Sequence, residues 1–145
     1  MAIAALITWV ITAAFGFVLL GTWIAKGGLR RTGGATSTFT TPLVFGHFLL
    51  AAAGLVLWIV YLLIDKDILA WVAFVALIVV AGLGDVMVLR WVKVRRPTKS
   101  SVGAASAAGA VAERHFPTWV VVAHGVFAVA TVLLVLLTAL GIGGS

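Results

Sequence analysis

The chain has 145 residues, of which 63% are hydrophobic and only 10% are charged, and its mean hydropathy is +1.25. Soluble domains carry about 25% charged residues, so this composition excludes an ordinary soluble domain, and its hydrophobicity excludes intrinsic disorder. Cysteine is absent, which excludes disulfides, thiolate metal sites and cysteine nucleophiles. The composition therefore predicts an integral membrane protein, in which the net charge of +6 is first a signal of topology.

Four apolar segments are each long enough to cross a bilayer, which takes about 20 residues of helix. They lie at about residues 2–25, 42–64, 68–92 and 116–141. Their apolar runs are continuous rather than alternating, which favours helices over the strands of a membrane barrel. The first segment lacks a positively charged start and is too long for a signal peptide. The sequence thus predicts an all-α, four-helix transmembrane bundle that forms a single domain, residues 1–145.

The charges between these segments predict the topology. Nine of the ten Lys and Arg residues lie in or beside two loops, residues 26–41 and 93–115, whereas the second and third segments are joined only by Asp65-Lys66-Asp67. Short loops with such a positive bias stay in the cytoplasm. We expect a plasma (inner) membrane protein with both termini outside and the basic loops cytoplasmic. Residues 101–112 are small and weakly polar, which is typical of a flexible linker.

The two predicted hairpins resemble each other, as a tandem repeat would. The first and third segments both contain Trp-Val, and the second and fourth both read His-x3-Ala-x2-small. The matching residues are Trp9-Val10 with Trp71-Val72, and His47, Ala51 and Gly54 with His124, Ala128 and Thr131. Such matches also arise by chance in sequence rich in Ala and Gly, so both explanations stay open at this point.

Three ionisable residues lie inside the predicted helices at similar depth. At a rise of 1.5 Å per residue, His47 and His124 lie roughly 8–13 Å inside the inner boundary, and Asp85 lies about 10 Å inside it. Ionisable groups are costly within a bilayer and mark functional sites by default. This layer is therefore the candidate site. His115 lies at the inner boundary, where we expect an interfacial role.

Haem binding is the first of three interpretations of this layer. Two histidines at matched depth on two helices meet the minimum for bis-imidazole ligation of haem b. His47 and His124 would be the axial ligands, and Asp85 would orient one of them by a hydrogen bond. The haem propionates would point to the cytoplasmic surface, near Arg90 and its basic neighbours.

The other two interpretations need no haem. His47, Asp85 and His124 could bind a divalent metal such as zinc, iron or copper, or could carry protons, as in a small proton- or metal-coupled transporter. Alternatively, the histidines could form hydrogen bonds between helices and fix their packing, in a cofactor-free structural or assembly subunit of a membrane complex.

Two resemblances bear on these interpretations. Glu113 through Pro117, followed by His124-Gly125 and residues 128–131, resemble small uncharacterised bacterial four-helix membrane proteins, a likeness that covers mainly residues 112–142 and implies no activity. More loosely, the arrangement of His47 and His124 is similar to cytochrome b561-type cores and membrane cytochrome b anchors. That resemblance implies haem held by histidines of different helices, with electrons passing between quinone and a partner. Those families carry more histidines, so one intramembrane pair implies a single haem.

Other chemistry lacks the residues that it needs. The sequence contains no GxGxxG motif after a strand, no Walker A motif, no HExxH and no CxxC. It gives no basis for an enzyme acting on soluble substrates, and it has no folded basic domain for nucleic acid. The sequence favours a haem b-binding electron-transfer or redox-accessory protein in the lipid bilayer. Its small size suggests a homo-oligomer or a subunit of a larger respiratory or redox complex.

Overall fold

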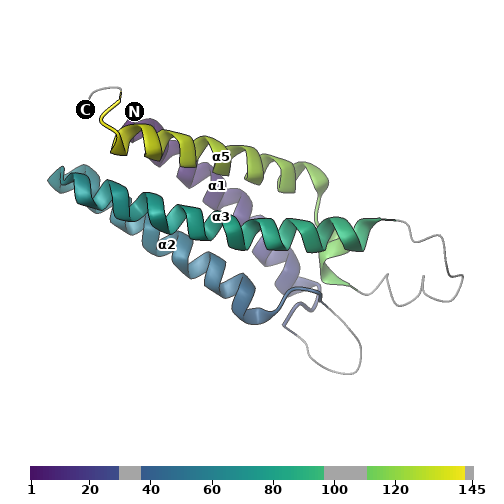
Figure 1. Ribbon diagram of the computed structural model, residues 1–145. Helices are drawn as coiled ribbons and strands as arrows, with labels where there is room; N and C mark the ends of the chain where they lie inside the picture. Colours follow the sequence, from purple (N-terminus) through teal and green to yellow (C-terminus); the bar gives the residue numbers. More distant parts are fainter. Residues whose placement is uncertain (30–36, 97–110, 143–145) are drawn as a thin grey trace, which may run out of the picture.

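The computed structural model describes residues 1–29, 37–96 and 111–142. Within these ranges the chain forms four long helices, α1 (Ala2–Ala25), α2 (Thr41–Ile64), α3 (Asp67–Arg95) and α5 (Thr118–Ala139), and a short 3₁₀ helix, η1 (Ala112–His115). The long helices lie side by side in an elongated bundle (Figure 1). This confirms the predicted all-α, four-helix architecture. The predicted linker at residues 101–112 lies outside the described residues except at its last two positions.

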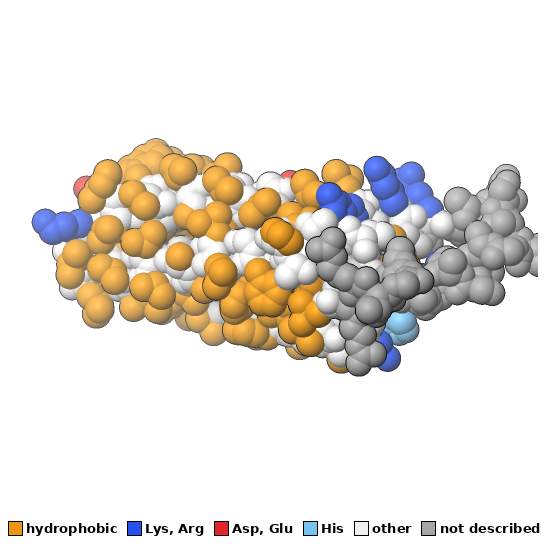
Figure 2. Space-filling model, turned by 90° about the horizontal axis from the view of Figure 1, so that it is seen from below, with side chains coloured by type: hydrophobic (Ala, Val, Ile, Leu, Met, Phe, Trp, Pro, Cys, Tyr) orange, Lys and Arg blue, Asp and Glu red, His pale blue; other side chains and the backbone are white. Residues whose placement is uncertain are grey.

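All four long helices are long and apolar enough to cross a membrane. Their outer surface is also apolar, since Leu49, Leu63 and Val126 have exposed fractions of 61%, 77% and 62%. Figure 2 shows hydrophobic side chains over most of the visible length of the bundle. A soluble domain rarely exposes so continuous an apolar surface, whereas lipid tails solvate it. The chain therefore has the surface of an integral membrane protein.

The charged ends of the bundle follow the pattern that the loops predict. The two termini and the turn between α2 and α3 lie at one end (Figure 1). Most of the visible Lys and Arg side chains lie toward the opposite end (Figure 2). Here we call the end with the termini the terminal end and the other the basic end. That the basic end faces the cytoplasm stays a prediction.

Three helix limits differ from those expected by two residues or more, one of them the end of α5 at Ala139 rather than near residue 141. α3 continues to Arg95 rather than ending near Val92, and Lys93 and Arg95 lie in its last turn, where cations interact favourably with the helix dipole. The last helix begins at Thr118 rather than near residue 116, because the chain first forms η1 and Pro117 is the residue that caps α5. Proline lacks the N–H that helix propagation needs, so it fits this boundary.

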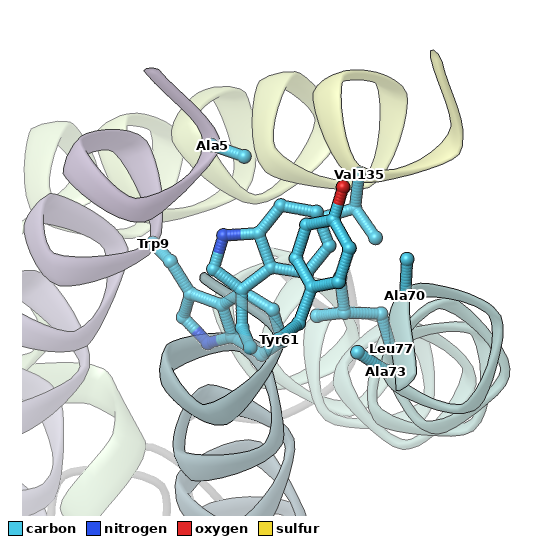
Figure 3. Close-up of a cluster of buried hydrophobic side chains, with 8 residues drawn as sticks. Ala5, Trp9, Tyr61, Ala70, Ala73, Leu77 and Val135 are labelled. Carbon is cyan, nitrogen blue, oxygen red and sulfur yellow. The ribbon is translucent and has the colours of Figure 1, made fainter. Parts of the chain in front are cut away.

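An aromatic core holds the terminal end together (Figure 3). The ring centroid of Trp58 lies 6.5 Å from that of Trp9 and 4.8 Å from that of Tyr61. Trp58 is fully buried, and its Nε1 donates a hydrogen bond to the Ala2 carbonyl at 3.2 Å. The side chains packed around these rings come from α1, α3 and α5 and are Ala5, Ala70, Ala73, Leu77 and Val135.

A second core closes the basic end. It consists of buried side chains from α1, α2, α3 and the segments just before α2 and α5, namely Trp23, Phe39, Val44, Trp91, Ala112 and Phe116. A carboxylate lies within it: Glu113 is fully buried. Its Oε1 accepts hydrogen bonds from the backbone N–H groups of Thr38 at 2.9 Å and Phe39 at 3.0 Å, and from the hydroxyl of Ser37. The two cores leave a layer between them, and the intramembrane histidines lie in that layer.

Candidate functional site

His47 of α2 and His124 of α5 face each other across the middle layer. Their ring centroids lie 6.2 Å apart, and the ring planes make an angle of 51°. The two residues lie far apart in the chain and on different helices, so this approach is a product of the bundle. It confirms that the two histidines share one depth, as their positions along the predicted helices indicate.

A backbone carbonyl of a neighbouring helix fixes each ring. Nδ1 of His47 lies 3.0 Å from the carbonyl oxygen of Val80 in α3, and Nδ1 of His124 lies 2.9 Å from that of Thr12 in α1. A carbonyl oxygen can only accept, so Nδ1–H must be the donor in both rings. In the neutral imidazole, Nε2 then keeps its lone pair. Both rings are therefore oriented through one nitrogen, while the nitrogen suited to metal ligation carries no hydrogen bond to a described residue.

A glycine lies beside each ring, one helical turn after the carbonyl that fixes it. A Cβ added at Gly84 would lie 3.3 Å from Cε1 of His47, and one added at Gly16 would lie 3.2 Å from Cε1 of His124. These separations are tighter than ordinary carbon contacts, which lie near 3.5–4.0 Å. Glycine at these two positions thus leaves the space that each imidazole occupies.

The two sets of groups, each made of an imidazole, a carbonyl and a glycine, indicate a repeat within the bundle. α1 packs mainly against α5, and α3 mainly against α2. Each helix that carries a histidine therefore packs against the helix that supplies the orienting carbonyl and the neighbouring glycine. The register that matches Thr12 and Gly16 with Val80 and Gly84 also matches buried Ala5 with Ala73 and buried Trp23 with Trp91. Trp9 then matches Leu77, and not Trp71 as the Trp-Val pairs suggest. The hairpin repeat that the sequence left open is supported by this geometry, with a different register in the first and third helices.

The histidines line a cavity of about 970 Å³ in the middle of the bundle. All four long helices contribute to it, and its wall is almost entirely apolar, with His47, His124, Thr12, Thr131 and Asp85 among the few polar side chains. The cavity opens toward the sides of the bundle, since its lining includes the exposed residues Phe17, Val122 and Val126. A large apolar cavity with a few convergent polar groups is the usual form of a ligand or cofactor site.

Asp85 borders this cavity but does not orient either ring. It is exposed on α3, and no hydrogen bond joins it to His47 or His124 in the described parts of the chain. The carbonyls of Val80 and Thr12 fill the orienting role that the sequence assigns to Asp85. Among residues 1–29, 37–96 and 111–142, no three His, Asp, Glu or Cys side chains gather as metal ligands. The expected cation site of His47, Asp85 and His124 is therefore not assembled here.

Comparison with protein-family models, with curated proteins and with solved structures gives no match for this chain. What the site binds is therefore inferred from its own residues.

The remaining predicted site residues lie at the basic end. Arg90 of α3 reaches toward the start of α2, where its Nη1 donates a hydrogen bond to the Thr38 carbonyl at 2.9 Å. His115 is exposed in η1, away from the histidine pair, as an interfacial residue would be.

Sequence reasoning missed the polar contacts that close the basic end of the cavity. Nε1 of Trp23 donates a hydrogen bond to Oγ of Ser37 at 2.8 Å, and Ser37 in turn contacts the buried Glu113. Trp23 and Trp91 both line the cavity. Glu113 lies far from Ser37 in sequence, beside Arg114 and His115, and nothing in the sequence distinguishes it from a solvated loop charge.

Proposed function

We propose that this protein binds one haem b between His47 and His124 and acts as an electron-transfer or redox-accessory subunit of the membrane. The observation that carries the proposal is the pair of facing imidazoles whose Nδ1 atoms are both held by carbonyls. Histidines that bind metal through one nitrogen almost always donate the other N–H to a carbonyl, carboxylate or water. Both rings meet this condition, and both line the same cavity.

The separation of the rings favours two ligands on opposite sides of one metal. A ring nitrogen lies about 1.2 Å from its centroid and metal–imidazole bonds are about 2.0–2.1 Å long, so opposed rings have centroids about 6.4 Å apart. Two rings at a tetrahedral angle would bring the centroids to about 5.2 Å. The observed 6.2 Å is close to the opposed arrangement, which is that of the axial ligands of a six-coordinate haem.

The cavity supports the same proposal. A macrocycle between the rings needs apolar space on all sides of the iron, and about 970 Å³ of mostly apolar cavity surrounds the histidine layer. Gly16 and Gly84 keep each imidazole edge clear of a side chain. When bound, haem would supply one-electron chemistry. The chain would hold it, orient its ligands and exclude water with the two cores.

The partners follow from this proposal and from the predicted topology. We expect the basic end to face the cytoplasm and the termini to lie outside. One haem gives one redox site, so electrons must be exchanged with another protein or with a lipid-soluble carrier such as quinone. A homo-oligomer or a larger respiratory or redox complex would provide such a neighbour.

A visible spectrum of the purified protein tests the proposal. Protein made in haem-sufficient cells and purified in detergent should show a sharp b-type α-band in the reduced-minus-oxidised spectrum. His47→Ala and His124→Ala should each lose the band, whereas His115→Ala should keep it, because His115 is exposed outside the cavity. A colourless wild-type protein, or a band that survives both cavity substitutions, would contradict the proposal.

The second candidate is a cofactor-free structural or assembly subunit. The observation that favours it is that each histidine joins two helices, α2 to α3 and α5 to α1. In that case His47→Ala and His124→Ala would lower the thermal stability of a colourless protein. Metal analysis of the same samples would test the transporter interpretation, which predicts bound zinc, iron or copper.

A further inference from the structure

Trp91 of α3 is a buried side chain with an unused hydrogen-bond donor. Its exposed fraction is 9%, and its Nε1 is shielded from solvent and has no hydrogen-bond partner among the described residues. The side chain lines the central cavity at its basic end. A tryptophan of an interfacial belt turns its N–H to water or headgroups, and this one does not. A buried N–H without a partner is destabilising, so a ligand that accepts this hydrogen bond would be favoured.

The repeat sharpens this contrast. Trp23 occupies the equivalent position in α1, and its Nε1 donates to Oγ of Ser37. Both tryptophans lie in the core at the basic end, but only Trp23 forms a side-chain hydrogen bond there. Of these two equivalent tryptophans, Trp91 is the one whose N–H no described residue accepts.

The surroundings of Trp91 favour an anionic acceptor. The guanidinium carbon of Arg95 lies 5.0 Å from the centre of the Trp91 ring. Arg90 and Lys93, on the same stretch of α3, add positive charge at this end. Carboxylates are the acceptors that such a site suits, because hydrogen bonds to an ionised group are roughly twice as strong as neutral ones.

The distance along α3 fits the acid side chains of a haem. Gly84 lies at the level of the His47 ring, and Trp91 lies seven residues further toward the basic end, about 10 Å along the helix axis. A haem ligated by the histidines, with its propionates directed to the basic end, would extend from the level of the His47 ring toward the level of Trp91.

We propose that Nε1 of Trp91 donates a hydrogen bond to a propionate carboxylate of the haem held by His47 and His124. This inference rests on the proposed function and adds the residue that fixes the rotation of the ring in the bundle. Trp91 is a binding residue that no motif in the sequence singles out.

Haem exchange on the purified full-length protein tests the proposal. Wild type, Trp91→Phe and Trp119→Phe are each loaded with haem b or with its dimethyl ester, and the rate of haem loss to a scavenger protein and the midpoint potential are measured. Trp119 is the matched control, because it lies near the same end of the bundle and is 67% exposed. We expect Trp91→Phe to lose haem b about 10- to 100-fold faster than wild type while keeping a bis-histidine spectrum. The dimethyl ester should show a much smaller difference, since it has no carboxylate, and Trp119→Phe should resemble wild type.

Three outcomes would overturn the proposal and leave bis-histidine haem binding intact. In the first, Trp91→Phe and Trp119→Phe lose haem at equal rates. In the second, Trp91→Phe changes the loss of haem b and of its dimethyl ester equally. In the third, Trp91→Phe lowers the stability of the protein as much without haem as with it. The third outcome would mean that Nε1 of Trp91 pairs with a group of the protein itself. The candidate is Oε2 of Glu113, the other buried side-chain atom without a hydrogen-bond partner in the described residues. A wild-type protein that takes up no haem would instead contradict the proposed function and this inference with it.

Discussion

Gly16 and Gly84 occupy equivalent places in the two halves of the bundle, each against the Cε1 edge of a histidine. Each lies four residues after the residue whose carbonyl holds that histidine, Thr12 or Val80. Carbonyl, glycine and imidazole thus form one unit that occurs twice, once on α1 and α5 and once on α3 and α2. The duplication brings two equivalently held imidazoles to one cavity, with an angle of 51° between their ring planes, as the proposed pair of axial ligands would need.

Alanine at these glycines should disturb the histidines. A Cβ at 3.2 or 3.3 Å from Cε1 forces the ring to move by a few tenths of an ångström, and overpacking of this kind costs about 1–3 kcal/mol. We expect Gly16→Ala and Gly84→Ala each to lower the melting temperature in detergent and to weaken haem retention. Gly21→Ala and Gly82→Ala are matched controls, since a Cβ at either position has open space. Equal behaviour of all four variants would contradict the assigned close contact.

The identity of one axial ligand should set the redox potential. Replacing a histidine ligand by methionine raises the potential of a haem, as histidine–methionine ligation does in cytochromes c. We expect His124→Met to retain haem with a higher midpoint potential and an altered α-band, and His115→Met to leave both unchanged. Potentiometric titration of the two variants measures this. A haem spectrum in His124→Met identical to that of wild type would mean that His124 is not a ligand.

Much of this fold follows from the sequence, and part of the site does as well. The long uninterrupted apolar runs predict four spanning helices, and counting residues from the helix ends places His47 and His124 at one depth. Helix rotation could not be predicted, because it depends on which faces pack. Rotation is what leaves Asp85 exposed at the border of the cavity while Gly84, its neighbour, lies against His47. The orienting carbonyls could not be predicted either, because every residue has a carbonyl and only the packing of the helices determines that those of Val80 and Thr12 contact the histidines.

Glu113 should stabilise the basic end of the bundle. Its Oε1 accepts two backbone N–H bonds, from Thr38 and Phe39, in a fully buried place. Glu113→Ala would remove the acceptor of the Thr38 N–H and one of the two acceptors of the Phe39 N–H, which also donates to Oγ of Ser37 at 3.0 Å. A hydrogen bond to an ionised acceptor contributes about 1.5–3 kcal/mol. We expect a loss of about 1.5–3 kcal/mol of stability, measured by unfolding in detergent, and faster proteolysis before α2.

Two further variants make the Glu113 measurement specific. Glu113→Gln keeps an acceptor oxygen but gives neutral hydrogen bonds, so its loss should be smaller than that of alanine. Asp67→Ala removes an exposed carboxylate at the start of α3 and should cost at most about 1 kcal/mol. If Glu113→Ala unfolds no more easily than Asp67→Ala, the buried carboxylate is not a stabilising contact.

The orientation of the bundle can be decided with single cysteines, because the chain has none of its own. Lys66 in the turn between α2 and α3 and Arg114 in η1 are both exposed and lie at opposite ends of the bundle. The positive bias of the loops at the basic end predicts that this end stays in the cytoplasm. In intact cells, a membrane-impermeant maleimide should therefore label Lys66→Cys and leave Arg114→Cys unlabelled, while permeabilised cells should give labelling of both. The reverse pattern would invert the bundle and with it the side on which Trp91 and the proposed haem propionates lie. Labelling of both variants in intact cells would mean that the chain inserts in both directions.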